Sequence, residues 1–259
     1  MNKESNANKP KISVVMPTYN RALYIVEAIK SVQNQTLRDS ELIVVDDGST
    51  DDTEKIVRGI AATDPRISFY KNERNLGIAK TRNRGVGLAK ADYVAMLDSD
   101  DVWVSPDKLA KQLSFFEHND RLGIVGTNAS FMDESGKPIG KRTRFPSDDG
   151  DIRRTELYRN MLMQSSLVIR KSAIEKAGGY DPKFTVCDDH DLWLKIGIDW
   201  QFMILPSANL TYRIHKGGIT KAKRIKTARE ELELLFKFKN HYPGFLKGLL
   251  KCAARFFAF

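Results

Sequence analysis

Short apolar segments of strand length alternate with helical patterns through the first hundred residues of the sequence. Residues 12–16, 42–45, 67–70 and 93–97 are rich in aliphatic and aromatic side chains. The stretches between them carry apolar residues at helical spacing, as in residues 23–32 and 78–88. Repeated strand–helix units build a mainly parallel sheet with right-handed crossovers. This half of the chain therefore predicts an α/β fold with a Rossmann-like, mainly parallel central sheet flanked by helices.

The second half of the sequence lacks this regular alternation. A polar, turn-rich segment spans residues 133–151. Five short apolar segments follow it, at residues 166–169, 174–177, 192–198, 202–205 and 210–214. We interpret them as mixed strands and short helices on the same sheet, and residues 221–259 as helical. The sequence thus predicts one domain over residues 1–217 and a basic amphipathic helical tail over residues 218–259.

Positive charge is concentrated in that tail. The chain has a net charge of +9, but residues 1–215 carry 31 basic and 30 acidic side chains, whereas residues 216–259 carry 11 Lys and Arg against three Glu. A nucleic-acid enzyme gathers basic residues at its working cleft, so we expect no nucleic-acid partner. Lys247, Lys251 and Arg255 share one face of the predicted helix. The tail either contacts a membrane surface or a partner protein, or packs on its own domain with these charges solvated.

The composition of the sequence indicates the cellular compartment in which we expect the protein. No apolar run approaches the roughly 18 residues of a membrane span, and the polar first 11 residues lack the apolar core of a secretory signal. The two cysteines, Cys187 and Cys252, lie far apart. We expect a cytoplasmic protein, either free or peripheral on the inner face of the cytoplasmic membrane.

Acidic residues gather where two predicted strands end. Asp46 and Asp47 follow one strand, and Asp98, Asp100 and Asp101 follow another. Ligands of open parallel sheets bind at the carboxyl ends of the strands, so we expect these carboxylates to converge on one crevice. A hard divalent ion bridging carboxylate and phosphate oxygens would relieve their repulsion. Turn formation and helix capping are the ordinary alternatives.

Two later features of the sequence also allow both a functional and a purely structural interpretation. The acidic run at residues 188–191 is either part of a site or a solvated helix start favoured by the helix dipole. His215, one of four histidines, is either a ligand or an ordinary satisfied side chain.

Eight short motifs follow one another along the sequence. They are residues 14–20 (VVMPTYN), 44–51 (VVDDGSTD), 75–83 (NLG…TRN), 97–101 (LDSDD), 170–172 (RKS), 178–181 (GGYD), 189–193 (DHDLW) and 212–215 (YRIH). In their order and approximate spacing they resemble the motifs of family 2 glycosyltransferases. The resemblance covers residues 11–217. It implies the GT-A fold and the inverting transfer of a sugar from a nucleotide diphosphate donor, which we expect to be a UDP-sugar.

The resemblance implies a pocket for the donor's base. Thr18 and Tyr19 would line it, with the Tyr19 ring stacking on uracil or another base. Asp47 would accept a hydrogen bond from the base, and Arg82 would supply compensating positive charge.

The same resemblance implies a metal site. Asp98 and Asp100 form the family's Asp-x-Asp pattern. Asp98 would face the ribose or the sugar, while Asp100 would hold Mn²⁺ or Mg²⁺ against the diphosphate. His215 would complete the diphosphate or metal site.

Inversion needs a base on the face of the sugar opposite the leaving group. Asp189 is the candidate, because it aligns with the second acid of the family's Glu-Asp pair. Asp188 replaces the more usual Glu, which leaves its role open, and Asp191 is the second candidate. Residues 164–166 and 178–179 would shape the acceptor side, or are simply a strand start and a turn.

Two features that are absent from the sequence indicate which kind of family 2 enzyme to expect. Processive family members carry membrane spans and a Gln-x-x-Arg-Trp motif, and this sequence has neither. We therefore expect a non-processive bacterial enzyme that adds one sugar to a lipid-linked glycan or a surface polysaccharide precursor.

Two other function classes compete with this interpretation. A nucleotidyltransferase or dinucleotide-binding oxidoreductase is disfavoured, because no G-x-G-x-x-G or P-loop pattern occurs. The second is a non-catalytic, membrane-associated scaffold of a glycan assembly complex. Retention of Asp100, Asp189 and His215 argues against it.

Overall fold

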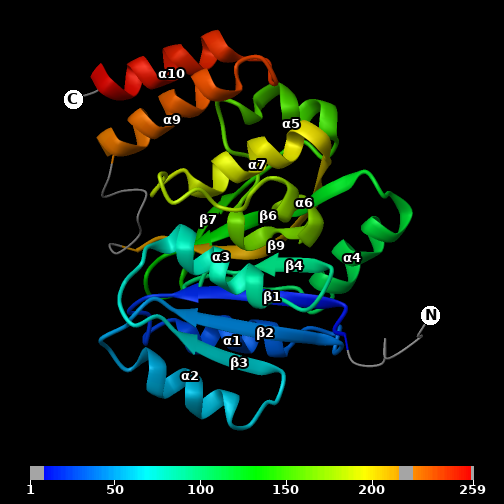
Figure 1. Cartoon of the computed structure of the whole chain (residues 1–259), viewed down its shortest axis with the longest axis vertical. Helices are drawn as coiled ribbons and strands as arrows, with labels where there is room; N and C mark the ends of the chain where they lie inside the picture. Colours follow the sequence, from blue (N-terminus) through cyan, green and yellow to red (C-terminus); the bar gives the residue numbers. More distant parts are fainter. Residues whose placement is uncertain (1–8, 216–223, 258–259) are drawn as a thin grey trace.

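Four strands make the parallel half of the sheet. The computed structural model describes residues 9–215 and 224–257. In it, β1 (Ile12–Thr18) pairs in parallel with β2 (Ser40–Asp46) and β4 (Tyr93–Met96), and β2 pairs in parallel with β3 (Ile67–Lys71). The arrowheads of β1, β2 and β3 point to the same side in Figure 1. The structure confirms all four strands that the sequence predicts in this half.

The second half adds strands of both directions. These strands are β5 (Val102–Trp103), β6 (Leu122–Met132), β7 (Pro138–Arg142), β8 (Val168–Arg170) and β9 (Gln201–Arg213). The strand order is β3-β2-β1-β4-β8-β6-β9-β5, with β7 paired to β6. Strands β6 and β9 pair in parallel, whereas β8 is antiparallel to both β4 and β6. The sheet is thus mainly parallel in its first half and mixed in its second.

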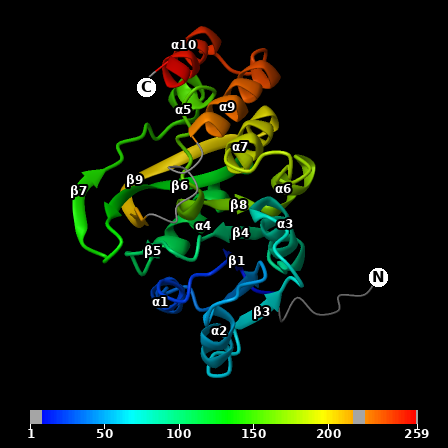
Figure 2. The same cartoon turned by 90° about the vertical axis from the view of Figure 1, so that its left-hand side faces the viewer.

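Helices cover both faces of the sheet. They are α1 (Ile25–Gln33), α2 (Thr53–Ala61), α3 (Ile78–Leu88), α4 (Lys108–His118), α5 (Asp149–Glu156), the 3₁₀ turn η1 (Gln164–Ser166), α6 (Lys171–Lys176), α7 (Asp188–Asp199), α9 (Arg224–Phe238) and α10 (Phe245–Phe257). Figure 2 shows α1 and α3 on opposite sides of β1.

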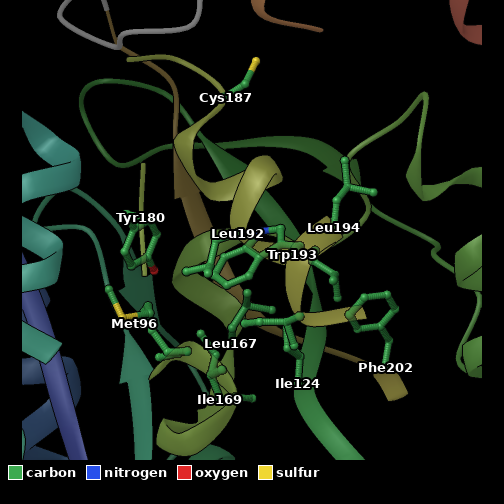
Figure 3. Close-up of a cluster of buried hydrophobic side chains, with 14 of the residues drawn as sticks. Met96, Ile124, Leu167, Ile169, Tyr180, Cys187, Leu192, Trp193, Leu194 and Phe202 are labelled. Carbon is green, nitrogen blue, oxygen red and sulfur yellow. The ribbon is translucent and has the colours of Figure 1, made fainter. Parts of the chain in front are cut away.

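Successive side chains of each strand point to opposite faces of the sheet and pack into two separate hydrophobic clusters. On β1, Val15 enters one cluster, while Ile12, Val14 and Met16 enter the other. The first cluster includes Trp193 of α7 and the side chains around it in Figure 3. The second packs under α1 and α4. Burial on both faces explains why the first strands lack polar alternation.

The order of the strands creates a crevice. Because β1 lies between β2 and β4, the chain crosses to opposite sides of β1, and loops at the carboxyl ends diverge there. The acidic residues after β2 and β4 therefore reach the same edge of the sheet, as the sequence predicts.

The C-terminal residues form two antiparallel helices rather than one continuous helix. Gly248 of α10 packs against Leu235 of α9, and both helices contribute buried side chains to the cluster around Trp193. Figure 1 shows the pair at one end of the molecule, beside α5 and α7. The predicted boundary between residues 217 and 218 lies outside the described residues.

The basic face expected on the tail is divided in the structure. Lys251 and Arg255 pair with Glu231 of α9, at 3.5 and 2.5 Å, so they are not directed at solvent as a set. Lys247 is exposed, as are Leu246 and Leu250, at 74% and 73%. Within the described ranges, no helix is long and apolar enough to cross a membrane. Both cysteines are free and buried.

Candidate active site

A cavity of about 840 Å³ opens at the carboxyl edge of the sheet. The ends of β1, β2 and β4, the first turn of α3 and the segment leading into α7 line it. The lining includes all eight residues that the sequence predicts for the site: Thr18, Tyr19, Asp47, Arg82, Asp98, Asp100, Asp189 and His215. The structure thus brings together side chains from widely separated segments.

The turn after β1 positions Thr18 and Tyr19. Asn20 adopts the left-handed conformation, with φ of 51°, which Asn tolerates better than most residues. Its side-chain oxygen accepts a hydrogen bond from Thr50 N at 2.9 Å. Thr18 is buried, and its Oγ1 has no hydrogen-bond partner among the described residues. The Tyr19 side chain is 42% exposed. An unpaired hydroxyl beside an accessible ring can serve a ligand that both stacks and hydrogen-bonds.

The Asp47 carboxylate holds the loop that leads into α3. Its Oδ1 accepts hydrogen bonds from Asn72 Nδ2 and Leu76 N, both at 2.8 Å, and its Oδ2 accepts one from Gly77 N at 3.0 Å. Gly77 has φ of 91°, which a residue with a side chain rarely adopts. Asp47 therefore orders the cavity wall, a function separate from its predicted contact with the base.

Arg82 links two acids from different segments. Its Nη1 donates to Asp188 Oδ2 at 2.7 Å, and its Nη2 donates to Asp98 Oδ1 at 3.0 Å. The guanidinium is almost completely buried. Burial raises the pKa of Asp98, although the nearby Arg82 charge opposes this effect. Because the Arg82 charge lies between the carboxylates of Asp98 and Asp188, these three charged groups can be buried close together.

Asp100 is paired with His215 and with Arg21. The distances from its Oδ2 are 2.9 Å to His215 Nε2 and 3.0 Å to Arg21 Nε. Burial alone would raise the pKa of Asp100, but the His215 hydrogen bond and the Arg21 charge outweigh burial and lower it. Asp100 is therefore held as a carboxylate facing the cavity.

Asp100 and His215 offer an oxygen and a nitrogen ligand to a divalent ion. Across residues 9–215 and 224–257, no cluster of three His, Cys, Asp or Glu side chains could hold a metal by itself. Carboxylate and imidazole suit Mn²⁺ when further oxygens come from a phosphate and water. The two side chains fit an ion that binds together with a diphosphate.

Asp189 lines the cavity from the first turn of α7. Its Oδ1 accepts a hydrogen bond from His190 N at 2.6 Å, and Asn160 Nδ2 lies 3.4 Å from its Oδ2. Burial and the adjacent Asp188 carboxylate raise the pKa of Asp189 to about 7. A carboxyl with this pKa can take up and release a proton near neutral pH.

The second candidate for the base, Asp191, does not line the cavity. It is fully buried and forms ion pairs with Lys195 at 2.9 Å and Lys237 at 2.5 Å. Residues two apart on a helix point in nearly opposite directions, so only one of the two acids can face the cavity. Asp188 lies beside Asp189 and holds Arg82.

The sequence interpretation missed several residues of the site. Arg21 contacts Asp100, and Asn160 lies beside Asp189. Arg213 donates its backbone N–H to Asp101 at 2.9 Å and its Nε–H to the Asp100 carbonyl at 3.0 Å. Arg213 stands two residues before His215 in a motif that the sequence does single out, so that motif is the signal for it. Arg21 and Asn160 carry no comparable signal.

Comparisons with known proteins identify the family. Residues 13–178 match the model of glycosyl transferase family 2. An uncharacterized glycosyltransferase of Methanocaldococcus jannaschii is 33% identical over 240 residues, which cover 92% of this chain and 81% of that protein.

Two solved structures share the fold at lower identity. A mannosyltransferase from Pyrobaculum calidifontis in complex with GDP-Man and Mn²⁺ has a TM-score of 0.71 at 23% identity, over 95% of this chain and 69% of that one. S. aureus TarS in complex with UDP-GlcNAc has a TM-score of 0.73 at 19% identity, over 96% of this chain and 73% of that one. The architecture is the GT-A fold. On these matches, the chain belongs to glycosyl transferase family 2.

Proposed function

We propose that this glycosyltransferase moves one sugar, with inversion, from a UDP-sugar to a hydroxyl of a lipid-linked glycan or a surface polysaccharide precursor. One observation carries the proposal: Asp189, from the first turn of α7, lines the same cavity as Asp98, Asp100 and His215. A donor bound between these groups would expose its sugar to an acceptor beside Asp189.

The donor would bind along the carboxyl ends of β1, β2 and β4. The accessible Tyr19 ring and the unpaired Thr18 hydroxyl would receive the base. Asp98 would meet the ribose or the sugar, while Asp100 and His215 would meet the diphosphate. The mannosyltransferase binds GDP-Man with Mn²⁺ and TarS binds UDP-GlcNAc, and both complexes support a nucleotide sugar as donor.

The metal would be held by Asp100 and His215 together with phosphate oxygens. When bound, Mn²⁺ or Mg²⁺ would supply positive charge that favours departure of the nucleoside diphosphate. Arg21 stands next to Asp100 and adds positive charge on the same side.

Asp189 would take up the proton of the acceptor hydroxyl. The acceptor oxygen forms a bond to the anomeric carbon, the bond from that carbon to the diphosphate oxygen breaks, and its electron pair leaves with the nucleoside diphosphate. The hydroxyl proton passes to Asp189 Oδ2 and then to water. Asn160, at 3.4 Å from this oxygen, would orient it.

The exposed face of α10 supports a position at the inner surface of the cytoplasmic membrane. Leu246 and Leu250 lie one turn apart, and Lys247 and Lys239 are exposed near the same end of the hairpin. Exposed leucines with flanking lysines match the composition of segments that bind anionic lipid surfaces.

The decisive experiment is a panel of nucleotide sugars tested with and without Mn²⁺. UDP, GDP and their common sugar conjugates are titrated by calorimetry, and release of the nucleoside diphosphate is followed with each. Metal-dependent binding of one UDP-sugar and its turnover would support the proposal. Binding of no nucleotide sugar would favour the non-catalytic scaffold.

A further inference from the structure

Helix α9 contacts the segment that carries Asp189 through polar side chains of one face. We call residues 183–191 the Asp189 segment. Glu230, Glu233 and Lys237 are spaced by three and four residues and therefore point the same way. Glu233 pairs with Lys183, Lys237 pairs with Asp191, and Glu230 binds residues between them. Figures 1 and 2 both show α9 next to α7.

Glu230 makes the densest of these contacts. Its Oε2 accepts hydrogen bonds from the backbone N–H groups of Val186 and Cys187, both at 2.9 Å. Its Oε1 accepts from Thr185 N at 3.1 Å and from Thr185 Oγ1 at 3.2 Å. The Glu230 side chain is 9% exposed. Three consecutive N–H groups that converge on one carboxylate form an anion-binding nest.

These N–H groups belong to the entry into α7. The first N–H groups of a helix have no partner within the helix, and the residue before α7, Cys187, provides no side-chain cap. Glu230 accepts from the backbone of the three residues that lead into α7, the last of which, Cys187, is its N-cap residue. The negative charge of Glu230 favours the N-terminal end of α7. Thr185 and Val186 line the cavity, and Asp189 follows two residues after Cys187.

The second contact fixes the other side of the same turn. Lys237 Nζ donates to Asp191 Oδ1 at 2.5 Å, and Lys195 Nζ lies 2.9 Å from Asp191 Oδ2. The first turn of α7 is therefore held by α9 on both sides of Asp189. Apolar residues of α9, Leu234 and Leu235 among them, already provide packing, so the polar contacts are not needed for burial alone.

We propose that Glu230 is a positioning residue that sets the place of the Asp189 carboxylate in the cavity. The inference rests on the proposed function, in which Asp189 accepts the proton of the acceptor. Glu230 touches neither donor nor acceptor: it fixes the backbone from which Asp189 projects. A displacement of about 1 Å in a reacting group can lower a rate by about 100-fold, so loss of this contact affects turnover more than donor binding.

The test uses the full chain and compares Glu230→Ala with Glu231→Gln. Glu231, the neighbouring residue, pairs with Lys251 and Arg255 of α10, which makes it the matched control. We expect Glu230→Ala to lower the transfer rate about 10- to 100-fold with little change in the affinity for UDP with Mn²⁺. Hydrogen exchange at the amides of residues 185–187 should rise about tenfold. Glu231→Gln should change none of these quantities by more than about twofold.

Two further variants test the inference even if Glu230→Ala does not fold: Glu230→Gln, and the combination of a Glu230 substitution with Asp189→Asn. Glu230→Gln retains the side-chain length and one acceptor oxygen, so it should fold and show a smaller loss of rate even if Glu230→Ala unfolds. Because Glu230 acts through Asp189, adding Glu230→Ala to Asp189→Asn should reduce the rate no further.

The outcomes separate the inference from the proposed function. A slow Asp189→Asn variant together with normal transfer by Glu230→Ala and Glu230→Gln would overturn the role of Glu230 alone. Additive losses in the double variant would also overturn it, since Glu230 would then act elsewhere. A fully active Asp189→Asn variant would overturn the proposed base and, with it, the role of Glu230.

Discussion

His215 Nε2 lies 2.9 Å from Asp100 Oδ2, although 115 positions separate the two residues. The two-residue strand β5, directly after the acidic cluster, explains their proximity. It pairs antiparallel with β9, with Val102 opposite Thr211, and so returns the end of β9 to the end of β4. Arg213 then bonds Asp101 and the Asp100 carbonyl, which fixes the register next to His215. Because of this pairing, Asp100 from the first half of the sheet and His215 from the second half line the same part of the cavity.

The first prediction concerns Asp100. Asp100→Asn should abolish metal-dependent turnover, because the amide is a much weaker ligand for a hard cation than the carboxylate. The fold should persist, since the substitution preserves the size of the side chain. Initial rates over a Mn²⁺ titration, with thermal melting as the fold check, measure both effects.

Asp199→Asn is the matched control for this variant. Asp199 is half exposed and pairs only with Lys176 among the contacts of the described residues, so the rate should stay within about twofold of wild type. Undiminished transfer by Asp100→Asn in the presence of a chelator would contradict the assignment of Asp100 to the metal.

The second prediction separates two acids on one helix. Asp189→Asn should lower the transfer rate by about 10²–10⁴-fold with little change in donor affinity, as expected for loss of a general base. Asp191→Asn should instead lower the free energy of unfolding by about 1–3 kcal/mol, because Lys195 and Lys237 lose a charged partner. Steady-state kinetics and urea unfolding of both variants make the comparison. A large rate loss confined to Asp191→Asn would reverse the assignment.

The third prediction is a pH dependence of the transfer rate. Burial and the Asp188 charge raise the pKa of Asp189 to about 7, while Arg82 opposes the increase. A base must be deprotonated, so kcat/KM, which reports the groups of the free enzyme, should fall as the pH drops below about 7, approaching a tenfold loss per pH unit. The residual rate of Asp189→Asn should lack this acidic limb. A wild-type profile that stays flat from pH 5.5 to 8 would contradict it.

Local signals explain how much of the fold can be predicted from the sequence. The strands β1 to β4 are apolar runs bounded by turn residues, and α3 begins and ends where its apolar spacing does. In contrast, β7 lies within the polar segment 133–151 and α5 begins at its end, and no periodicity marks either element. β7 exists through its pairing with β6, as between Ser130 and Arg142. α5 starts at the Asp148 cap and buries little besides Ile152 and Glu156.

The site shows the same division between local and distant determinants. Asp47, Asp98 and Asp100 stand at strand ends, so the topology alone brings them to one edge. The partners of these groups cannot be predicted in this way, because Arg21 reaches Asp100 only through the tertiary structure. Glu230 also reaches the backbone before Asp189 from a different helix. Likewise, the sequence contains both Asp189 and Asp191, and only the docking of α7 decides which one faces the cavity.

The last prediction concerns the exposed face of α10 and its proposed contact with an anionic membrane. Removing residues 242–259 would strip Tyr242 and Cys252 from the hydrophobic core, so point variants are the sharper test. The double variant Leu246→Ser with Leu250→Ser changes two side chains that are 74% and 73% exposed, which leaves the core intact.

Loss of two inserted leucines should weaken binding to vesicles of phosphatidylglycerol and phosphatidylcholine by about 2–4 kcal/mol, or roughly 30- to 1,000-fold. Leu23→Ser, at a residue that is 87% exposed in the turn before α1, is the control and should bind as wild type does. Release of nucleoside diphosphate from the donor in water should be unchanged in both variants. Sedimentation with the vesicles measures the binding, and added salt should weaken the wild-type interaction because Lys239 and Lys247 contribute to it. If the double variant sediments as well as wild type, or if wild type does not sediment at all, α10 is not a membrane contact.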